Sequence, residues 1–405
     1  MAERNADFAR AALLARRATL RADPDLVASL VGLSREDAVA AIIGAPVSTA
    51  RATPNEKSDE TVTWWLRQIG GTESGLHERM SFFWHTLIPT HRYSVNHQEL
   101  VATQLNMIRD NSLGNYRNLL QGFVVDGAMI KYLDADSSTA RRPNENLARE
   151  LMELFSTGIG HYTETDVRQA ALAMTGWRVD RDTHAVYFDP ERAHTEPVTF
   201  LGDTRQWDVA SITDRLCDHP ATAARISGLL WYHLTGKTLN AGAAGELGVW
   251  WQDRSLEIRP LVERILLSDD FWSDHYTRPR SGFEYYAAVQ NILGLDPTRL
   301  YQARDLGQQL YEPPNVGGWP GGERWLNPDS MLRRSQTLFG VDFREVSGGT
   351  TATIDEILDR CGIYVVSDRT MAALAGADNP DGIGAEGVVQ LQWRIALSSP
   401  EFQLL

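Results

Sequence analysis

A strongly amphipathic segment at residues 143–155 constrains the fold more than any other feature of this chain. With about 100° of rotation per residue, its apolar and polar side chains fall on opposite arcs of a helix. The apolar arc holds Leu147, Ala148, Leu151, Met152, Leu154 and Phe155. The polar arc holds Asn146, Arg149, Glu150 and Glu153. A helix of this kind is stabilised mainly by burying its apolar face, so the segment predicts a packed helical structure.

The same helical spacing recurs along most of the chain. Ser34 and Asp37 are typical of a helix N-terminus, with Ser34 as the N-cap residue, and Thr163 with Asp166 forms a similar start. The predicted helices cover residues 5–22, 34–43, 60–68, 75–88, 96–111, 114–131, 144–157, 164–175, 209–216, 220–235, 245–251, 255–268, 281–293 and short segments within 355–405.

Two segments depart from the helical pattern. At 177–189, β-forming residues flank a polar Asp-Arg-Asp-Thr turn, which predicts a small β-hairpin. The segment that follows, up to Gly202, is expected to be an ordered loop. Residues 312–328 are too rich in proline and glycine for a regular helix. Trp319 and Trp325 are expected to anchor this long loop onto the core, because tryptophan buries a large area.

The fold class expected is therefore mainly α, a compact multi-helical domain with one hairpin near 177–189 and one long loop at 312–328. The chain has 405 residues, of which 43% are hydrophobic, so it can bury a large core. We expect N-terminal helices and a linker at 1–60, a main helical domain at 61–345, and a C-terminal helical segment at 346–405 packed on it.

The formal net charge of −14 argues against nucleic acid and anionic membranes as partners, because a negative surface repels phosphate groups. No run approaches the ~18 apolar residues of a membrane span. The first residues mix acids and arginines and lack the apolar stretch of a secretory signal, so a cytoplasmic location is expected. No GxSxG, HExxH, CxxC or GxGxxG motif stands in a useful place, so the corresponding enzyme classes lack support.

The polar arc of the 143–155 segment has three interpretations. It can line a pocket in which Glu150 and Glu153 act as metal ligands or as an acid/base pair, as carboxylates do in helical bundles. It can be a solvated surface, with Arg149 paired to Glu145 and to Glu153. It can also form a buried structural network. The residues leave all three open.

The histidines give weak signals. His85, His91 and His97 are spaced by six residues, which does not align metal ligands on one helix face, and Pro89 interrupts the segment. His85 stands beside a tryptophan, a pattern typical of a packed core histidine. His194 lies in a predicted loop and is a somewhat better candidate, because loops held by a scaffold often carry chemistry.

Several motifs together resemble one bacterial family, the domain-of-unknown-function 1800 family. They are PNENLARELMELFSTGIGHYTETDVRQAALAMTGW from 143, FDPERAHTEPVTFLG from 188, EPPNVGGWPGGERWLNPDSMLRR from 312, FFWHTL at 82–87 and LSSPEFQLL at the end. The resemblance spans about residues 75–405. It implies a predominantly helical fold and no established reaction, and many relatives look exported. Relatives commonly carry a second histidine in the early motif, where this chain has Leu87. A site that needs that histidine would be altered or inactive here.

The leading hypothesis is an enzyme with a site lined by carboxylates and histidines. Glu150, Glu153, His85 and His194 would be its catalytic or metal-binding groups, and the expected substrate-binding residues are Asn146, Arg149 and Trp319. The cofactor is unknown, and a divalent metal is the candidate, because oxygen-rich sites suit such ions; metal-assisted or acid/base hydrolysis is therefore expected. The competing hypothesis is a non-catalytic binding or assembly protein, in which the same polar residues form a structural network and the ligand is an unidentified small molecule or protein.

Overall fold

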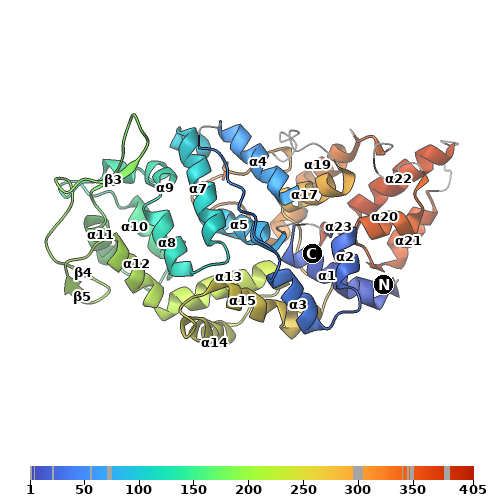
Figure 1. Ribbon diagram of the computed structural model, residues 1–405, viewed down its shortest axis with the longest axis horizontal. Helices are drawn as coiled ribbons and strands as arrows, with labels where there is room; N and C mark the ends of the chain where they lie inside the picture. The colour runs from blue at the N-terminus through green and yellow to red at the C-terminus, as the bar shows by residue number, and fades with distance from the viewer. Residues whose placement is uncertain are drawn as a thin grey trace.

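Helices make up most of the computed structural model (Figure 1), which confirms the predicted mainly α-helical fold. The structure describes residues 2–3, 5–20, 22–54, 57–70, 75–294, 304–339, 341–343, 346, 351–377 and 384–405. Within these ranges, no helix combines the length and the apolar character needed to cross a membrane.

The chain begins with three helices, α1 (Ala6–Ala18), α2 (Pro24–Leu30) and α3 (Arg35–Ile43). The predicted cap of α3 is confirmed, because the Ser34 hydroxyl accepts a hydrogen bond from the Asp37 N–H at 3.0 Å. Helix α1 is buried even at Arg17, whose guanidinium donates to the Asp274 carbonyl at 2.7 Å. Such bonds tie the N-terminal helix to distant parts of the chain.

The next helices are α4 (Ser58–Gly70), α5 (Gly75–Leu87), α6 (Arg92–Val95), α7 (Gln98–Asn111), α8 (Tyr116–Val124) and α9 (Gly127–Tyr132), followed by the short 3-10 helix η1 (Ala135–Ser137). The single helix predicted at 114–131 is therefore two helices. The break occurs because Asp126 adopts an extended backbone and caps α9, accepting the Met129 N–H at 2.9 Å.

The amphipathic segment forms α10 (Asn146–Glu153), which pairs with α11 (Glu164–Ala173) as a helical hairpin. The capping box of Thr163 and Asp166 is confirmed. Helix α10 is shorter than predicted, because the chain leaves the helix at Leu154 and turns. Gly158, with φ +82°, then donates its N–H to the Met152 carbonyl at 2.8 Å.

The predicted hairpin is confirmed as strands β2 (Trp177–Val179) and β3 (Val186–Phe188), which pair antiparallel with Trp177 opposite Phe188. A second hairpin, β4 (Val198–Phe200) with β5 (Asp203–Arg205), occupies part of the segment expected to be a loop. The terminal strand β1 (Ala2–Glu3) pairs with β6 (Val365–Val366).

The remaining helices are α12 (Val209–Asp218), α13 (Pro220–Thr235), α14 (Ala241–Gln252), α15 (Ile258–Leu266), α16 (Asp269–Trp272), α17 (Gly282–Leu293), α19 (Pro328–Phe339), α20 (Ile354–Arg360), α21 (Asp368–Ala375), α22 (Gly384–Ser398) and α23 (Pro400–Gln403). Most of the predicted loop at 312–328 lacks regular structure, apart from the 3-10 helix η2 (Gly322–Leu326). Trp325 is buried, as an anchoring role requires.

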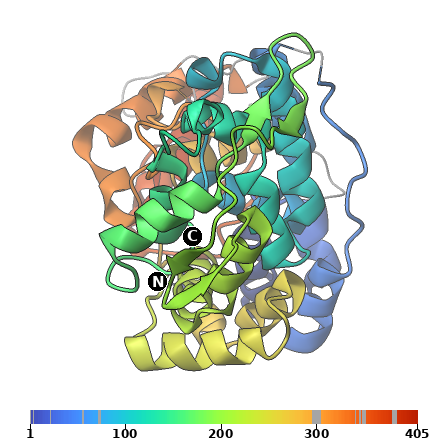
Figure 2. The ribbon, with the colours of Figure 1, turned by 90° about the vertical axis from the view of Figure 1, so that its left-hand side faces the viewer.

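The described core residues form two large apolar clusters. The first joins α1, α2 and α3 to α8, α10, α12, α13 and α15, and the second joins α4 and α7 to α17, α20 and α22. Both ends of the chain thus contribute to shared cores, while the domain boundaries at 60 and 345 stay predictions. The second boundary falls beside residues outside the described ranges. Figures 1 and 2 show α9–α12 and the two hairpins at one end of the molecule, opposite α20–α22.

Candidate metal centre

The polar arc of α10 is only partly buried, and ion pairs hold its arginine. The Arg149 guanidinium donates to both carboxylate oxygens of Glu164 on α11, at 2.7 and 2.8 Å, and to Glu145 at 3.1 Å. The pair with Glu145 is one of the two pairs predicted for a solvated face. Glu153 instead accepts a hydrogen bond from the Tyr162 hydroxyl at 3.3 Å, and Asn146 is exposed. This face therefore cross-links the two helices of the hairpin.

Glu150 lies half-buried beside Glu153 on the same face. Burial raises the pKa of Glu150, and the charge of Glu153 raises it further against the opposing effect of Arg149. Burial, followed by the charge of Glu150, also raises the pKa of Tyr132 on α9, so these two groups lie within electrostatic range. A carboxyl group with a raised pKa next to a second carboxylate can exchange a proton, which is the property that acid/base catalysis requires.

His85 is fully buried on α5. Burial lowers the pKa of His85 to about 3, so its imidazole is neutral near pH 7. Its Nε2 atom accepts the Tyr311 N–H at 3.2 Å, and its ring centroid lies 5.3 Å from that of Trp65 and 5.5 Å from that of Trp319. These contacts are typical of a histidine packed in the core, which is the interpretation that the neighbouring tryptophan in the sequence favours.

Trp319 and Leu87 line a separate cavity of about 190 Å³, together with Glu284 and Arg278. Glu284 is completely buried and receives hydrogen bonds from Arg278 at 2.7 and 2.9 Å. Leu87 therefore lines a cavity of mixed character, in which apolar rings stand beside Arg278, Glu284 and His233, and none of the α10 carboxylates is among the lining residues.

His194 lies in a third setting, in the segment between β3 and β4. Its backbone N–H donates to the Thr175 hydroxyl at 2.8 Å, and the residue lines a cavity together with Trp177 and Trp207. The structure thus places His85, His194 and the carboxylates of α10 in different surroundings, and their catalytic roles stay predictions.

A different set of residues forms a compact cluster of potential metal ligands. His97, Glu99 and His184 each offer one ligand atom, and these three atoms lie within 4.8 Å of one another. A side-chain nitrogen of His184 contacts the Glu99 carboxylate, and the rings of His97 and His184 are 4.2 Å apart between centroids. Two imidazoles and one carboxylate form a set that suits zinc and other first-row transition metals.

Local structure explains how these three side chains meet. His97 is the N-cap residue of α7 and Glu99 lies in the first turn of that helix. His184 ends the turn of the β2–β3 hairpin with φ +56°, a left-handed conformation that is uncommon for residues other than glycine but that histidine adopts more readily than most. Asp180 fixes the turn by accepting hydrogen bonds from the N–H groups of Asp182 and Thr183, at 3.0 and 2.8 Å. The hairpin therefore holds His184 over the start of α7.

The electrostatic surroundings favour the form of imidazole that binds metals. Burial lowers the pKa of His97, and the charges of His184 and Lys131 lower it further, while Asp136 opposes them. Lys131 is itself paired with Asp136 at 2.6 Å. The side chains of Glu99 and His184 keep 29% and 24% of their surface exposed, so an ion and a water molecule can reach them.

The sequence alone does not reveal this cluster. The histidines closest to His97 in sequence are His85 and His91, and neither is part of the cluster. The partner is His184, which belongs to a hairpin far along the chain, so no local spacing connects the two residues. Only the packing of the hairpin against α7 and α9 joins them.

A comparison with protein families matches residues 12–404 to a model described as "Protein of unknown function (DUF1800)". The match covers nearly the whole chain and includes every candidate site residue described above. No curated protein and no solved structure matches the chain.

Proposed function

The chain belongs to the DUF1800 family, whose description names no activity, and we propose that it functions with a divalent metal ion held by His97, Glu99 and His184. The observation that carries this proposal is the convergence of the three ligand atoms within 4.8 Å. A nearby pair of imidazoles and a carboxylate is a much more specific combination than a group of surface acids, because the nitrogen ligands select transition metals.

Hydrolysis is the reaction class that this ligand set supports best. Catalytic zinc sites commonly use three protein ligands, including two histidines with one glutamate, and keep one position open for water. An ion in such a site lowers the pKa of that water to about 7 and polarises a carbonyl or phosphoryl oxygen. The partial exposure of Glu99 and His184 leaves room for water and for a substrate at this site.

The first test is zinc binding by the chelator-treated protein, measured by isothermal titration calorimetry. We expect one ion per chain, and we expect His97→Ala and His184→Ala each to weaken binding by about tenfold to hundredfold or more, because even outer partners of metal ligands have effects of that size. His91→Ala is the matched control, since His91 lies near His97 but outside the cluster. Zinc affinity that is unchanged in both cluster variants would refute the metal site.

The second arm tests hydrolysis. Chromogenic carboxylic and phosphoric esters are offered to the metal-free and zinc-loaded protein, and we expect turnover only with the ion, with loss in Glu99→Gln. Zinc binding without turnover of any ester would keep the metal site but remove the hydrolytic assignment.

The non-catalytic alternative rests on α10, where Arg149 bridges Glu145 and Glu164 across the helical hairpin. Glu150→Ala and Glu153→Ala separate the hypotheses by their melting temperatures. If these residues form a structural network, both variants melt well below the wild type. We expect only a small loss, of about 1 kcal/mol or less in the free energy of unfolding, because both carboxylates are partly exposed. A large loss would favour the assembly role.

A further inference from the structure

A cavity of about 680 Å³ lies at the base of the hairpin whose tip carries His184. Helix α8, the N-terminus of α12 and the segment from Trp177 to Trp207 supply its walls. The volume falls within the range of roughly 300–1,000 Å³ that is usual for sites of small organic ligands. The cavity is separate from the metal cluster, because its lining residues include neither His97 nor His184.

Three aromatic rings give the cavity its apolar walls. Trp177 and Phe188 are directly opposite each other on β2 and β3, with centroids 5.7 Å apart, and both line the cavity. Trp207 is buried and packs edge-on against Phe200 with a centroid distance of 5.5 Å. Rings held in this way present fixed faces against which another flat or apolar molecule can pack.

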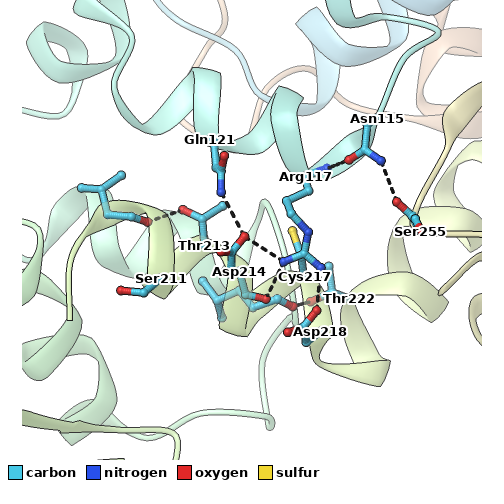
Figure 3. Close-up of polar contacts among 12 residues, drawn as sticks. Asn115, Arg117, Gln121, Ser211, Thr213, Asp214, Cys217, Asp218, Thr222 and Ser255 are labelled. Carbon is cyan, nitrogen blue, oxygen red and sulfur yellow. Dashed lines mark hydrogen bonds and ion pairs between the residues drawn. The ribbon is translucent and has the colours of Figure 1, made fainter. Parts of the chain in front are cut away.

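The polar side of the cavity is equally well ordered. Gln121, which lines the cavity from α8, donates its amide N–H to Asp214 on α12 at 3.0 Å. Asp214 also accepts a hydrogen bond from Arg117 at 2.8 Å, and Arg117 reaches on to Asp218 (Figure 3). The network fixes the amide of Gln121 and holds α8 and α12 together, so the wall between them is rigid.

The charges around the cavity argue against an ionic ligand. Among the residues that the structure describes, the lining includes no lysine and no arginine. The Arg205 guanidinium lies 3.8 Å from the centroid of the Trp207 ring, but it is paired with Asp203 and does not line the cavity, so no lining residue offers a phosphate or carboxylate a cationic partner. The carboxylate of Asp208, which also lines the cavity, already caps α12 and accepts the N–H and the hydroxyl of Ser211 at 2.8 and 2.6 Å. What remains for a ligand is aromatic surface, amide groups such as those of Asn118 and Gln121, and the imidazole of His194.

We propose that this cavity is a binding site for an uncharged organic molecule with a broad apolar or aromatic face. The rings of Trp177, Phe188 and Trp207 pack against that face, and the amides and His194 hydrogen-bond to its neutral polar groups. The site requires no metal ion, so it can be tested independently of the proposed hydrolytic function.

Two fluorescent probes of nearly the same shape test the proposal on the full chain after chelator treatment. N-phenyl-1-naphthylamine is neutral, and 8-anilinonaphthalene-1-sulfonate carries a sulfonate on the same ring system. We expect the neutral probe to bind saturably with one molecule per chain and the sulfonate to bind about tenfold more weakly or worse. Equal affinity for the two probes would overturn the assignment of an uncharged ligand.

The location is tested by Ala210→Trp, which places a large ring at an exposed lining position in the first turn of α12. We expect the affinity for the neutral probe to fall by about tenfold or more. Ala241→Trp, at an exposed position in the first turn of α14, is the matched control and should not change the affinity. Unchanged affinity in a folded Ala210→Trp variant would overturn the site, and Thr195→Trp replaces that variant if it fails to fold.

Discussion

Glu284→Gln is expected to lower the free energy of unfolding by about 3–5 kcal/mol, the usual cost of removing one partner from a buried ion pair. Glu284 is completely buried at the start of α17, where its carboxylate contacts Arg79 at 2.5 Å and Arg278 at 2.7 Å. Glutamine keeps the shape and the hydrogen bond to the Ser281 N–H, but it leaves two buried cations without their anion. Urea denaturation near neutral pH measures the loss.

Glu356→Gln is the control for this change. Glu284 and Glu356 both occupy the N3 position of a capping box, three residues after the N-caps Ser281 and Thr353, but Glu356 is exposed. Glutamine also serves in a capping box, so the control removes one charge at almost the same local geometry. We expect a change of about 0.5 kcal/mol or less for Glu356→Gln. Similar losses in the two variants would mean that the buried arginines do not depend on Glu284.

The same ion cluster makes stability depend on acidity in a definite direction. Burial alone raises the pKa of Glu284, but Arg278 and Arg79 outweigh burial and hold the pKa well below its usual value. Because the folded-state pKa is depressed, the contribution of Glu284 is present above the ordinary glutamate pKa and is lost as the pH falls toward the folded-state value. Glu284→Gln should therefore show a weaker acid-dependent loss of stability than the wild type.

Features set by neighbouring residues were predictable from the sequence. The apolar arc of the 143–155 segment predicts which face of α10 is buried, and Leu147, Ala148 and Leu151 on that arc are all buried. The caps at Ser34 and Thr163 and the hairpin at 177–189 were also foreseen, because each depends on a few adjacent residues. The break at Asp126 was not predicted, because the helical spacing of apolar residues continues through it, although aspartate is a favoured N-cap residue and accepts the Met129 N–H here.

Features set by distant residues were not predictable. The sequence around Glu284 reads as a capping box, and nothing near it reveals Arg79 as its partner. His184 likewise shows its relation to His97 and Glu99 only after the hairpin packs on α7. The polar arc of α10 was ambiguous for a related reason, since its exposure is decided by Glu164 and Tyr162, which belong to the following loop and helix. Local pattern identified the elements, and tertiary packing decided which side chains meet.

Asp126→Asn is expected to stabilise the protein increasingly as the pH rises. Asp126 lies between α8 and α9, where burial raises its pKa to about 7 against the hydrogen bonds from Met129 and Gln104. A raised folded-state pKa means that the folded protein holds a proton that the unfolded chain releases, so wild-type stability falls with pH until the carboxyl ionises. Between about pH 5 and about pH 8 this loss amounts to about 2–3 kcal/mol. Asparagine does not ionise, so the variant should lack this loss.

The comparison is made by urea denaturation of the wild type and the variant at both pH values. The Oδ1 atom of Asp126 accepts the Met129 N–H at 2.9 Å and the Gln104 amide at 2.6 Å. Asparagine keeps this oxygen, so the cap of α9 should be preserved. Asp208→Asn is the matched control, because Asp208 also caps a helix but its hydrogen bonds with Ser211 lower its pKa. Asp208 is ionised throughout this range in both states, and its substitution should shift stability equally at the two pH values. A pH-independent effect of Asp126→Asn would show that Asp126 is already ionised at about pH 5 in the folded protein.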